Sequence, residues 1–222
     1  MRLVLASSSP RRREILGLLG VPFEILVPDL AEMFDPRRPA PDEAAHWALQ
    51  KARAVAMAIG GPAGTPVPPG ADTVALVIGS DTLIDLARQK IGKPTSPEDA
   101  LRILKRLAGR EHWVVTAVGA VFPDGREKSA IEVVRVKMRA ASDDALARYV
   151  DTGDPLDKAG GYSLQGAGRD LIESIDGDYL AAVGLPLKPV VRFLLAAGIT
   201  PPVDVAALYR DRTFLNWRTY QP

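Results

Sequence analysis

The sequence RLVLASSSPRRREILGLLG, residues 2–20, contains a strand signal, a loop signal and a helix signal in succession. Residues 2–6 are apolar and rich in β-forming side chains, and three serines and a proline follow them. Apolar residues then recur at helical spacing over residues 15–19, and Gly20 is a typical helix terminator. The stretch therefore predicts a strand, a loop and a helix.

The remaining chain continues this alternation in its first half and changes pattern in its second half. Hydrophobic period and turn residues predict a strand at 21–27, a loop at 28–41, a helix at 41–59, a buried strand pair within 73–86, a helix at 95–109, a hairpin of 113–122 with 127–138, a helix at 142–149, a helix-like stretch after 168, a turn at 176–178 and a helix at 189–197. Strand–helix alternation followed by a hairpin predicts an α/β (mixed α+β) fold with a mixed sheet.

The Pro- and Gly-rich residues 60–70 are predicted to form a surface loop, because strand-like patterns resume directly after them. We therefore expect a single domain over residues 1–198. Residues 199–222 contain three prolines and no clear apolar period, so they are expected to form a partly ordered C-terminal extension.

Composition excludes several classes of function. The 222 residues contain 28 Lys plus Arg and 27 Asp plus Glu, for a net charge of +1, so no global field attracts nucleic acid or anionic membrane. The absence of Cys excludes disulfides, thiolate zinc sites and Cys nucleophiles, and only two His are present. A bound metal would therefore need oxygen ligands.

The N-terminal pattern indicates a cytoplasmic protein. Its Arg cluster follows the short apolar run, which is the reverse of a signal peptide. No segment approaches the roughly 20 apolar residues of a membrane helix.

Ser7, Ser9, Arg11 and Arg12 lie where the first strand leads into the first helix. Hydroxyls, backbone N–H groups and guanidinium groups at such a point can converge on a phosphate. The alternative is that Ser9 is an N-cap, Pro10 the first helical residue and the arginines a solvated first turn.

Two further charged residues stand in apolar surroundings. Lys51 falls on the apolar stripe of the 41–59 helix, so its amine either reaches out to solvent or meets an anion. Asp81 separates apolar runs that predict the buried strand pair, and a buried carboxylate normally has a cation, a hydrogen-bond donor or a catalytic task. The alternative is that residues 80–82 form an exposed tight turn.

The segment DKAGGYSLQG, residues 157–166, combines charges, glycines and an amide. Its glycines permit close backbone approach to a ligand, and Gln165 offers a donor and an acceptor to a planar base. A plain glycine-rich loop fits the composition equally well. His46 and His112 have no third ligand nearby in sequence, so we expect structural or exposed roles for them.

The ordered set ASSSPRRREIL, PDLAE, LQKA, GSDT, GKP, DKAGGYSLQG and GLPL resembles the Maf family of nucleoside triphosphate pyrophosphatases. The resemblance spans residues 3–198 apart from the 60–70 loop. It implies a curved mixed sheet with helices on its sides and two lobes around a central cleft, as in inosine triphosphatases. It also implies release of pyrophosphate from a nucleoside triphosphate with Mg²⁺ or Mn²⁺, and often a homodimer.

The resemblance also implies roles for individual residues. Asp81 matches the family's proton acceptor, and Glu32 matches an acid that lies with Asp81 near the metal. The branch with Gln in the glycine-rich motif resembles the dTTP/UTP pyrophosphatases, whose specificity positions match Arg11, Thr82 and Gln165. The matched phosphate-binding residues are Ser7, Arg11, Arg12, Lys51 and Lys93.

Two other functions stay open at this point. The chain could be a nucleotide-binding regulator of septum formation that does not need turnover, or a 7-methyl-GTP pyrophosphatase. The combination of Asp81 with Lys51, Lys93 and Gln165 favours an enzyme, since a pure binding protein has no need of a carboxylate beside phosphate-binding cations.

Overall fold

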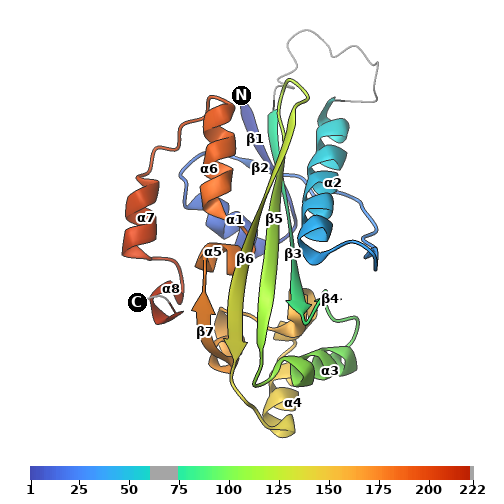
Figure 1. Cartoon of the computed structure of the whole chain (residues 1–222). Helices are drawn as coiled ribbons and strands as arrows, with labels where there is room; N and C mark the ends of the chain where they lie inside the picture. Colours follow the sequence, from blue (N-terminus) through green and yellow to red (C-terminus); the bar gives the residue numbers. More distant parts are fainter. Residues whose placement is uncertain (61–74, 221–222) are drawn as a thin grey trace.

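The computed structural model describes residues 1–60 and 75–220, and these form a mixed β-sheet with helices on both faces (Figure 1). The strands are β1 (Arg2–Ala6), β2 (Glu24–Ile25), β3 (Ala75–Leu86), β4 (Gln89–Ile91), β5 (Glu111–Val121), β6 (Glu127–Met138) and β7 (Ile172–Asp176). The helices are α1 (Pro10–Gly17), α2 (Ala40–Gly60), α3 (Pro97–Leu107), α4 (Asp143–Asp151), α5 (Tyr179–Val183), α6 (Leu187–Ala196), α7 (Val205–Asp211) and α8 (Trp217–Tyr220).

The strands follow the order β2-β1-β3-β5-β6-β7, and the short β4 pairs with the end of β3. β1 is parallel to β2 and β3, whereas all pairings among β3 to β7 are antiparallel. The mixed sheet and the β5–β6 hairpin predicted from the sequence are therefore confirmed.

Alternation along β3 divides the core between the two faces of the sheet. Leu76, Ile78 and Ile84 belong to the large core cluster on the side of α1, α5 and α6. Val77 and Leu83 point to the opposite face, where they meet the alanines of α2. Figure 1 shows α2 along the long strands, on the side opposite α5 and α6. Because β3 is covered on both faces, Ser80 and Asp81 are buried, and Thr82 is half-buried.

Helix α2 crosses the sheet over a cross-strand pair of glycines, Gly79 of β3 and Gly119 of β5. A Cβ atom on Gly79 would lie 2.2 Å from the carbonyl oxygen of Ala48, and one on Gly119 would lie 2.7 Å from the amide nitrogen of Leu49. The helix backbone therefore rests directly on the sheet at this point. This close approach places Lys51, also on α2, above the neighbouring Asp81.

Two strand predictions require correction. β3 runs without interruption through Asp81, so there is neither a strand pair nor an exposed turn at residues 80–82. The Ser80 hydroxyl lies within hydrogen-bond distance of the carbonyl oxygens of Ala117 and Gly184, which satisfies this polar side chain inside the strand. The predicted 21–27 strand is reduced to Glu24–Ile25, because only these residues pair with β1.

The predicted helix-like stretch after residue 168 is also wrong. A 3₁₀ segment, Gly166–Leu171, leads into strand β7, which pairs with β6 across a register shift. The isolated sequence of this edge strand contains too few apolar residues to reveal its partner. Asp178 then caps α5 by accepting the N–H of Leu180 at 2.9 Å.

The C-terminal residues are more ordered than their sequence pattern suggests. Trp217 is 1% exposed and stacks on Tyr179, with ring centroids 5.9 Å apart. The Tyr209 hydroxyl donates to Asp178 at 2.8 Å. Helices α7 and α8 thus pack against the main core.

The predicted 60–70 loop lies outside the described residues apart from Gly60, which ends α2. Within the described part of the chain, no helix combines the length and apolarity needed to cross a membrane.

We expect Gly119→Ala to lower the free energy of unfolding by about 1–3 kcal/mol, because the added methyl group overpacks the contact with α2. Urea denaturation measures this change. Gly17→Ala is the matched control, since no atom lies within 4 Å of the added Cβ. Equal unfolding free energies for Gly119→Ala and the wild type would contradict the close packing.

His112 is 2% exposed, its Nε2 lies 2.7 Å from the Tyr162 hydroxyl, and burial lowers its pKa to about 4. The unfolded chain therefore binds a proton near pH 6.5 that the folded chain accepts only near pH 4. We expect stability to be lost as the pH falls through this interval, by about 1.4 kcal/mol per pH unit from this group. His112→Phe should flatten the pH dependence of the free energy of unfolding, which urea titrations measure. Parallel curves of this free energy against pH for the two proteins would contradict the lowered pKa of His112.

Candidate active site

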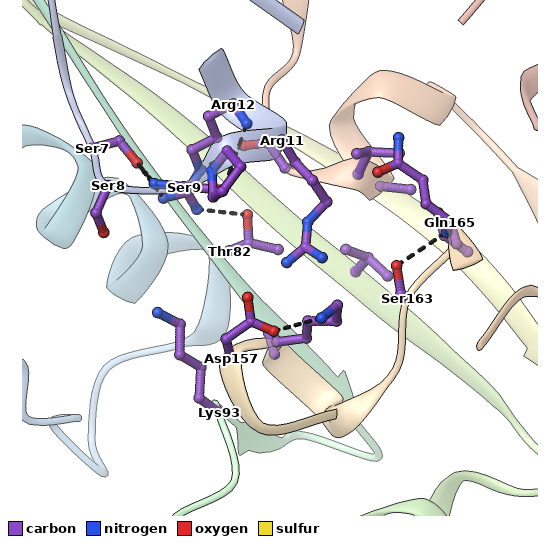
Figure 2. A pocket seen from close by; sticks show the side chains of 18 of the residues that line it. Ser7, Ser8, Ser9, Arg11, Arg12, Thr82, Lys93, Asp157, Ser163 and Gln165 are labelled. Carbon is purple, nitrogen blue, oxygen red and sulfur yellow. Dashed lines mark hydrogen bonds and ion pairs between the residues drawn. The ribbon is translucent and has the colours of Figure 1, made fainter. Parts of the chain in front are cut away.

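A cavity of about 230 Å³ opens between the β1–α1 loop, the middle of β3 and the 157–166 segment (Figure 2). Eight of the nine site residues implied by the family resemblance line it: Ser7, Arg11, Arg12, Glu32, Lys51, Thr82, Lys93 and Gln165. Asp81 is the exception, since it lies directly behind Lys51 and does not line the cavity. The structure therefore gathers residues that are up to 158 positions apart in the chain.

The β1–α1 loop is organised by its serine side chains. Ser9 is the N-cap of α1 and accepts the N–H of Arg12 at 3.5 Å. The buried Ser7 hydroxyl accepts the N–H of Ser9 at 3.2 Å. The capping role weighed for Ser9 is therefore present, and the same turn brings Ser7, Arg11 and Arg12 to the cavity.

The Arg12 guanidinium is fixed in place by three partners. Its Nε donates to the carbonyl oxygen of Gly184 at 2.9 Å, and its two Nη atoms donate to Thr82 Oγ1 at 3.1 Å and to Ser7 Oγ at 3.4 Å. Burial lowers the pKa of Arg12, and the nearby acids Asp81 and Glu32 oppose this effect. Arg12 is thus a pre-positioned cation rather than a solvated first-turn residue.

Lys51 links the two predicted acids. Its Nζ lies 2.6 Å from Asp81 Oδ1 and 2.9 Å from Glu32 Oε1. The Lys51 side chain is only 10% exposed, so it meets anions rather than extending into solvent. Burial raises the pKa of Asp81, and Lys51 and Arg12 offset part of that rise. Lys51 thus compensates part of the cost of burying this carboxylate, and the raised pKa makes Asp81 a stronger base than a solvated aspartate.

Glu32 and Asp81 are also the residues that suit a divalent metal. Their oxygens already converge on one cation, the Lys51 ammonium. Mg²⁺ typically binds one or two carboxylates and completes its shell with water and substrate phosphates. The described residues contain no group of three or more His, Cys, Asp or Glu that could hold a metal alone. The donor set therefore fits a metal that binds together with a phosphate ligand.

The opposite wall of the cavity belongs to the 157–166 segment. The backbone N–H of Gln165 donates to Ser163 Oγ at 3.1 Å, which fixes the start of its side chain. Gln165 Nε2 is buried and has no hydrogen-bond partner among the described residues. Asp157 pairs with Lys158, and Figure 2 shows its carboxylate directed into the same space as Arg11 and Lys93.

Sequence reasoning did not single out two of these residues. Asp157 lines the cavity, but the sequence of its glycine-rich segment does not show which way its side chain points. Gly184 contributes its carbonyl oxygen to Arg12, a role that leaves no side-chain signal. Its φ of +132° lies in a region that L side chains rarely adopt, which explains why a glycine stands there.

Comparison with known proteins gives a consistent set of relatives. The family model described as Maf-like protein matches residues 2–197. The dTTP/UTP pyrophosphatase of Dictyoglomus turgidum is 43% identical over 188 residues, covering 83% of this chain and 90% of the relative. The dTTP/UTP pyrophosphatase of Moorella thermoacetica is 42% identical over 199 residues, covering 89% and 96%. That of Bacillus pumilus is 37% identical over 201 residues, covering 90% and 98%.

Two solved structures are similar at much lower identity. The Ham1 protein of Staphylococcus aureus matches with a TM-score of 0.43 and 16% identity, covering 78% of this chain and 81% of that one. A nucleoside-triphosphatase (dITP/XTP pyrophosphatase) of Mycobacterium abscessus matches with a TM-score of 0.40 and 15% identity, covering 89% and 97%. The family match over residues 2–197 and the identity to curated relatives show that the chain belongs to the Maf family.

Proposed function

We propose that this protein hydrolyses dTTP and UTP to the nucleoside monophosphate and pyrophosphate. The observation that carries the proposal is the Lys51 ammonium between the carboxylates of Asp81 and Glu32, at the wall of a cavity lined with cations. The names of relatives that share about 40% identity over most of their length support the same activity.

The triphosphate binds to cations already present in the cavity. Arg12 is held by hydrogen bonds to Gly184 and Thr82, and Arg11 and Lys93 line the same space. Because Arg12 is fixed before the ligand arrives, little side-chain entropy is lost on binding. These cations stabilise the negative charge that accumulates on the departing pyrophosphate.

Asp81 accepts a proton from the attacking water. The water oxygen forms a bond to the α-phosphorus, and the bond from the α-phosphorus to the bridging α–β oxygen breaks, so that pyrophosphate leaves with those electrons. In the structure Lys51 covers Asp81. The phosphates compete for the Lys51 ammonium, and its move toward them frees a carboxylate whose pKa burial has raised.

Glu32 and Asp81 are the residues that would hold Mg²⁺ or Mn²⁺ in this site. When bound, such a cation supplies further neutralisation of phosphate charge. Glu32 and Asp81, which share the Lys51 ammonium in the structure, would then keep a compensating cation when Lys51 moves toward the phosphates.

Gln165 recognises the base of the nucleotide. Its buried Nε2 has no partner in the described part of the protein and can donate to a carbonyl oxygen of thymine or uracil. Leaving a buried donor unpaired costs about 1–3 kcal/mol, so a base that supplies the acceptor gains that much in discrimination.

We expect Asp81→Asn to fold and bind nucleotide but to lose at least about 100-fold in kcat, because the amide cannot accept the proton. Pyrophosphate release from dTTP, UTP, CTP, 7-methyl-GTP, ATP and ITP with Mg²⁺ or Mn²⁺ measures both the activity and its preference. Asp85→Asn is the matched control on the same strand, where an amide oxygen can still accept the Arg88 N–H.

A variant Asp81→Asn with full turnover would remove the proton-acceptor role. Nucleotide binding by the wild type without turnover of any substrate in the panel would instead indicate the regulator weighed above. Preference for 7-methyl-GTP would indicate the other pyrophosphatase branch.

We expect Gln165→Glu to lower kcat/KM for dTTP and UTP by at least about 10-fold, because a carboxylate offers the base no donor. The ratio of kcat/KM between dTTP and ATP should fall with it. Gln89→Glu is the matched control, since Gln89 lies on β4 and bonds to Arg106 outside the cavity. An unchanged substrate ratio would show that Gln165 does not contact the base.

A further inference from the structure

An ion pair between a fully buried carboxylate and a mostly buried ammonium lies outside the cavity and is not used by the proposed chemistry. Glu43, in the first turn of α2, is 0% exposed, and its Oε2 lies 2.9 Å from the Nζ of Lys90 on β4. Glu43 Oε1 accepts the indole N–H of Trp47 at 2.9 Å. Burial favours the neutral form of Glu43, but hydrogen bonds from Lys90, Asp35 and Trp47 together hold its pKa below the usual range.

Both members of this pair bind the main chain of one loop. Glu43 Oε1 accepts the backbone N–H of Asp35 at 3.3 Å. Lys90 Nζ donates to the carbonyl oxygen of Arg38 at 2.8 Å and also to that of Asp35. All three ammonium protons of Lys90 are thus used, two of them by the backbone of residues 35–38. The loop is held from the side of α2 and from the side of β4.

Residues 35–38, whose backbone Glu43 and Lys90 bind, begin three residues after Glu32. Phe34 lies between Glu32 and this segment, and the centroid of its ring is 5.7 Å from Lys90 Nζ. The ring also packs against Gly92, where a Cβ atom would lie 2.9 Å from it. The Glu32 side chain is 38% exposed and forms an ion pair with Lys51. Its reach to Lys51 therefore depends on where the backbone of its loop is held.

The same strand also leads to the cationic wall of the cavity. Lys93 follows Lys90 by three residues, and the carbonyl oxygen of the intervening Gly92 accepts the N–H of Gly160 at 2.9 Å. This backbone bond ties the turn that carries Lys93 to the 157–166 segment without the Lys90 ammonium, whose three hydrogen bonds go to Asp35, Arg38 and Glu43.

An ion pair of this kind is not needed for stability alone. Replacing a buried pair by apolar residues of similar volume is often neutral or stabilising, because desolvation of the two charges offsets their attraction. Apolar side chains cannot, however, bind a backbone N–H and two carbonyl oxygens at the same time. What the pair adds over an apolar contact is the fixed position of the loop.

We propose that Lys90 and Glu43 are positioning residues that hold the Glu32 loop so that Glu32 reaches Lys51. The proposal rests on the function proposed above. It predicts that the pair acts on turnover only through Glu32, with no contact of its own to the substrate.

The test is a double-mutant cycle between Lys90→Met and Glu32→Gln, read as kcat/KM for dTTP. We expect Lys90→Met alone to lower kcat/KM by about 10- to 100-fold, as for other residues that orient a site. In the Glu32→Gln background, Lys90→Met should lower kcat/KM further by less than about threefold. Lys105→Met is the matched control, because Lys105 also pairs with a carboxylate, Asp143, but on the exposed face of α3.

A second readout does not depend on activity. The N–H of Asp35 is bonded to Glu43 in the wild type, so hydrogen exchange over residues 29–38 should accelerate at least about tenfold in Lys90→Met and not in Lys105→Met. If Lys90→Met does not fold, the double variant Glu43→Gln/Lys90→Met carries both measurements, because it leaves no unpaired buried charge.

Less-than-additive losses together with faster exchange of the loop support the proposal. Losses that multiply, undiminished activity in the variant, or unchanged exchange over residues 29–38 would each overturn it. If the wild type releases no pyrophosphate from any nucleotide, the proposed function fails. The exchange measurement then decides by itself whether Lys90 and Glu43 hold the loop.

Discussion

The ion pair between Lys51 and Asp81 constrains the rest of the structure. A carboxylate inside a strand that is covered on both faces would cost several kcal/mol without a cation. Lys51 supplies that cation from α2, at 2.6 Å. For its amine to arrive there, the helix backbone must rest on the sheet, which requires glycines at positions 79 and 119. The packing of a whole helix thus follows from one buried charge.

The alternation of β3 distributes the site over both faces of the sheet. Asp81 points to α2 and Lys51, whereas Thr82, the next residue, points to the other face and accepts a hydrogen bond from Arg12. One strand therefore positions the acid on one face and the anchor of a cavity-lining cation, Arg12, on the other. The cavity lies where Lys51 and Arg12 both reach its wall. A rigid strand keeps this relation constant.

The sequence predicts those parts of the fold and site that depend on local pattern. Hydrophobic period identifies α2, α3 and the β5–β6 hairpin, and buried charge draws attention to Asp81. It does not predict β7 or the burial of Trp217, because both depend on partners distant in the chain. Nor does spacing reveal that Lys51 and Asp81, 30 residues apart, form a pair. Backbone groups such as the Gly184 carbonyl leave no side-chain signal at all.

Net charge is uninformative here because the charges are separated within the fold. The chain carries only one net positive charge. The cavity, in contrast, is lined by five cationic side chains and two acidic ones, Glu32 and Asp157, with Asp81 behind them as a third acid; the cations are Arg11, Arg12, Lys51, Lys93 and Lys158. A compact anion meets this local excess at short range, whereas an extended polyanion meets a nearly neutral surface. The fold thus concentrates positive charge at the cavity although the chain as a whole is nearly neutral.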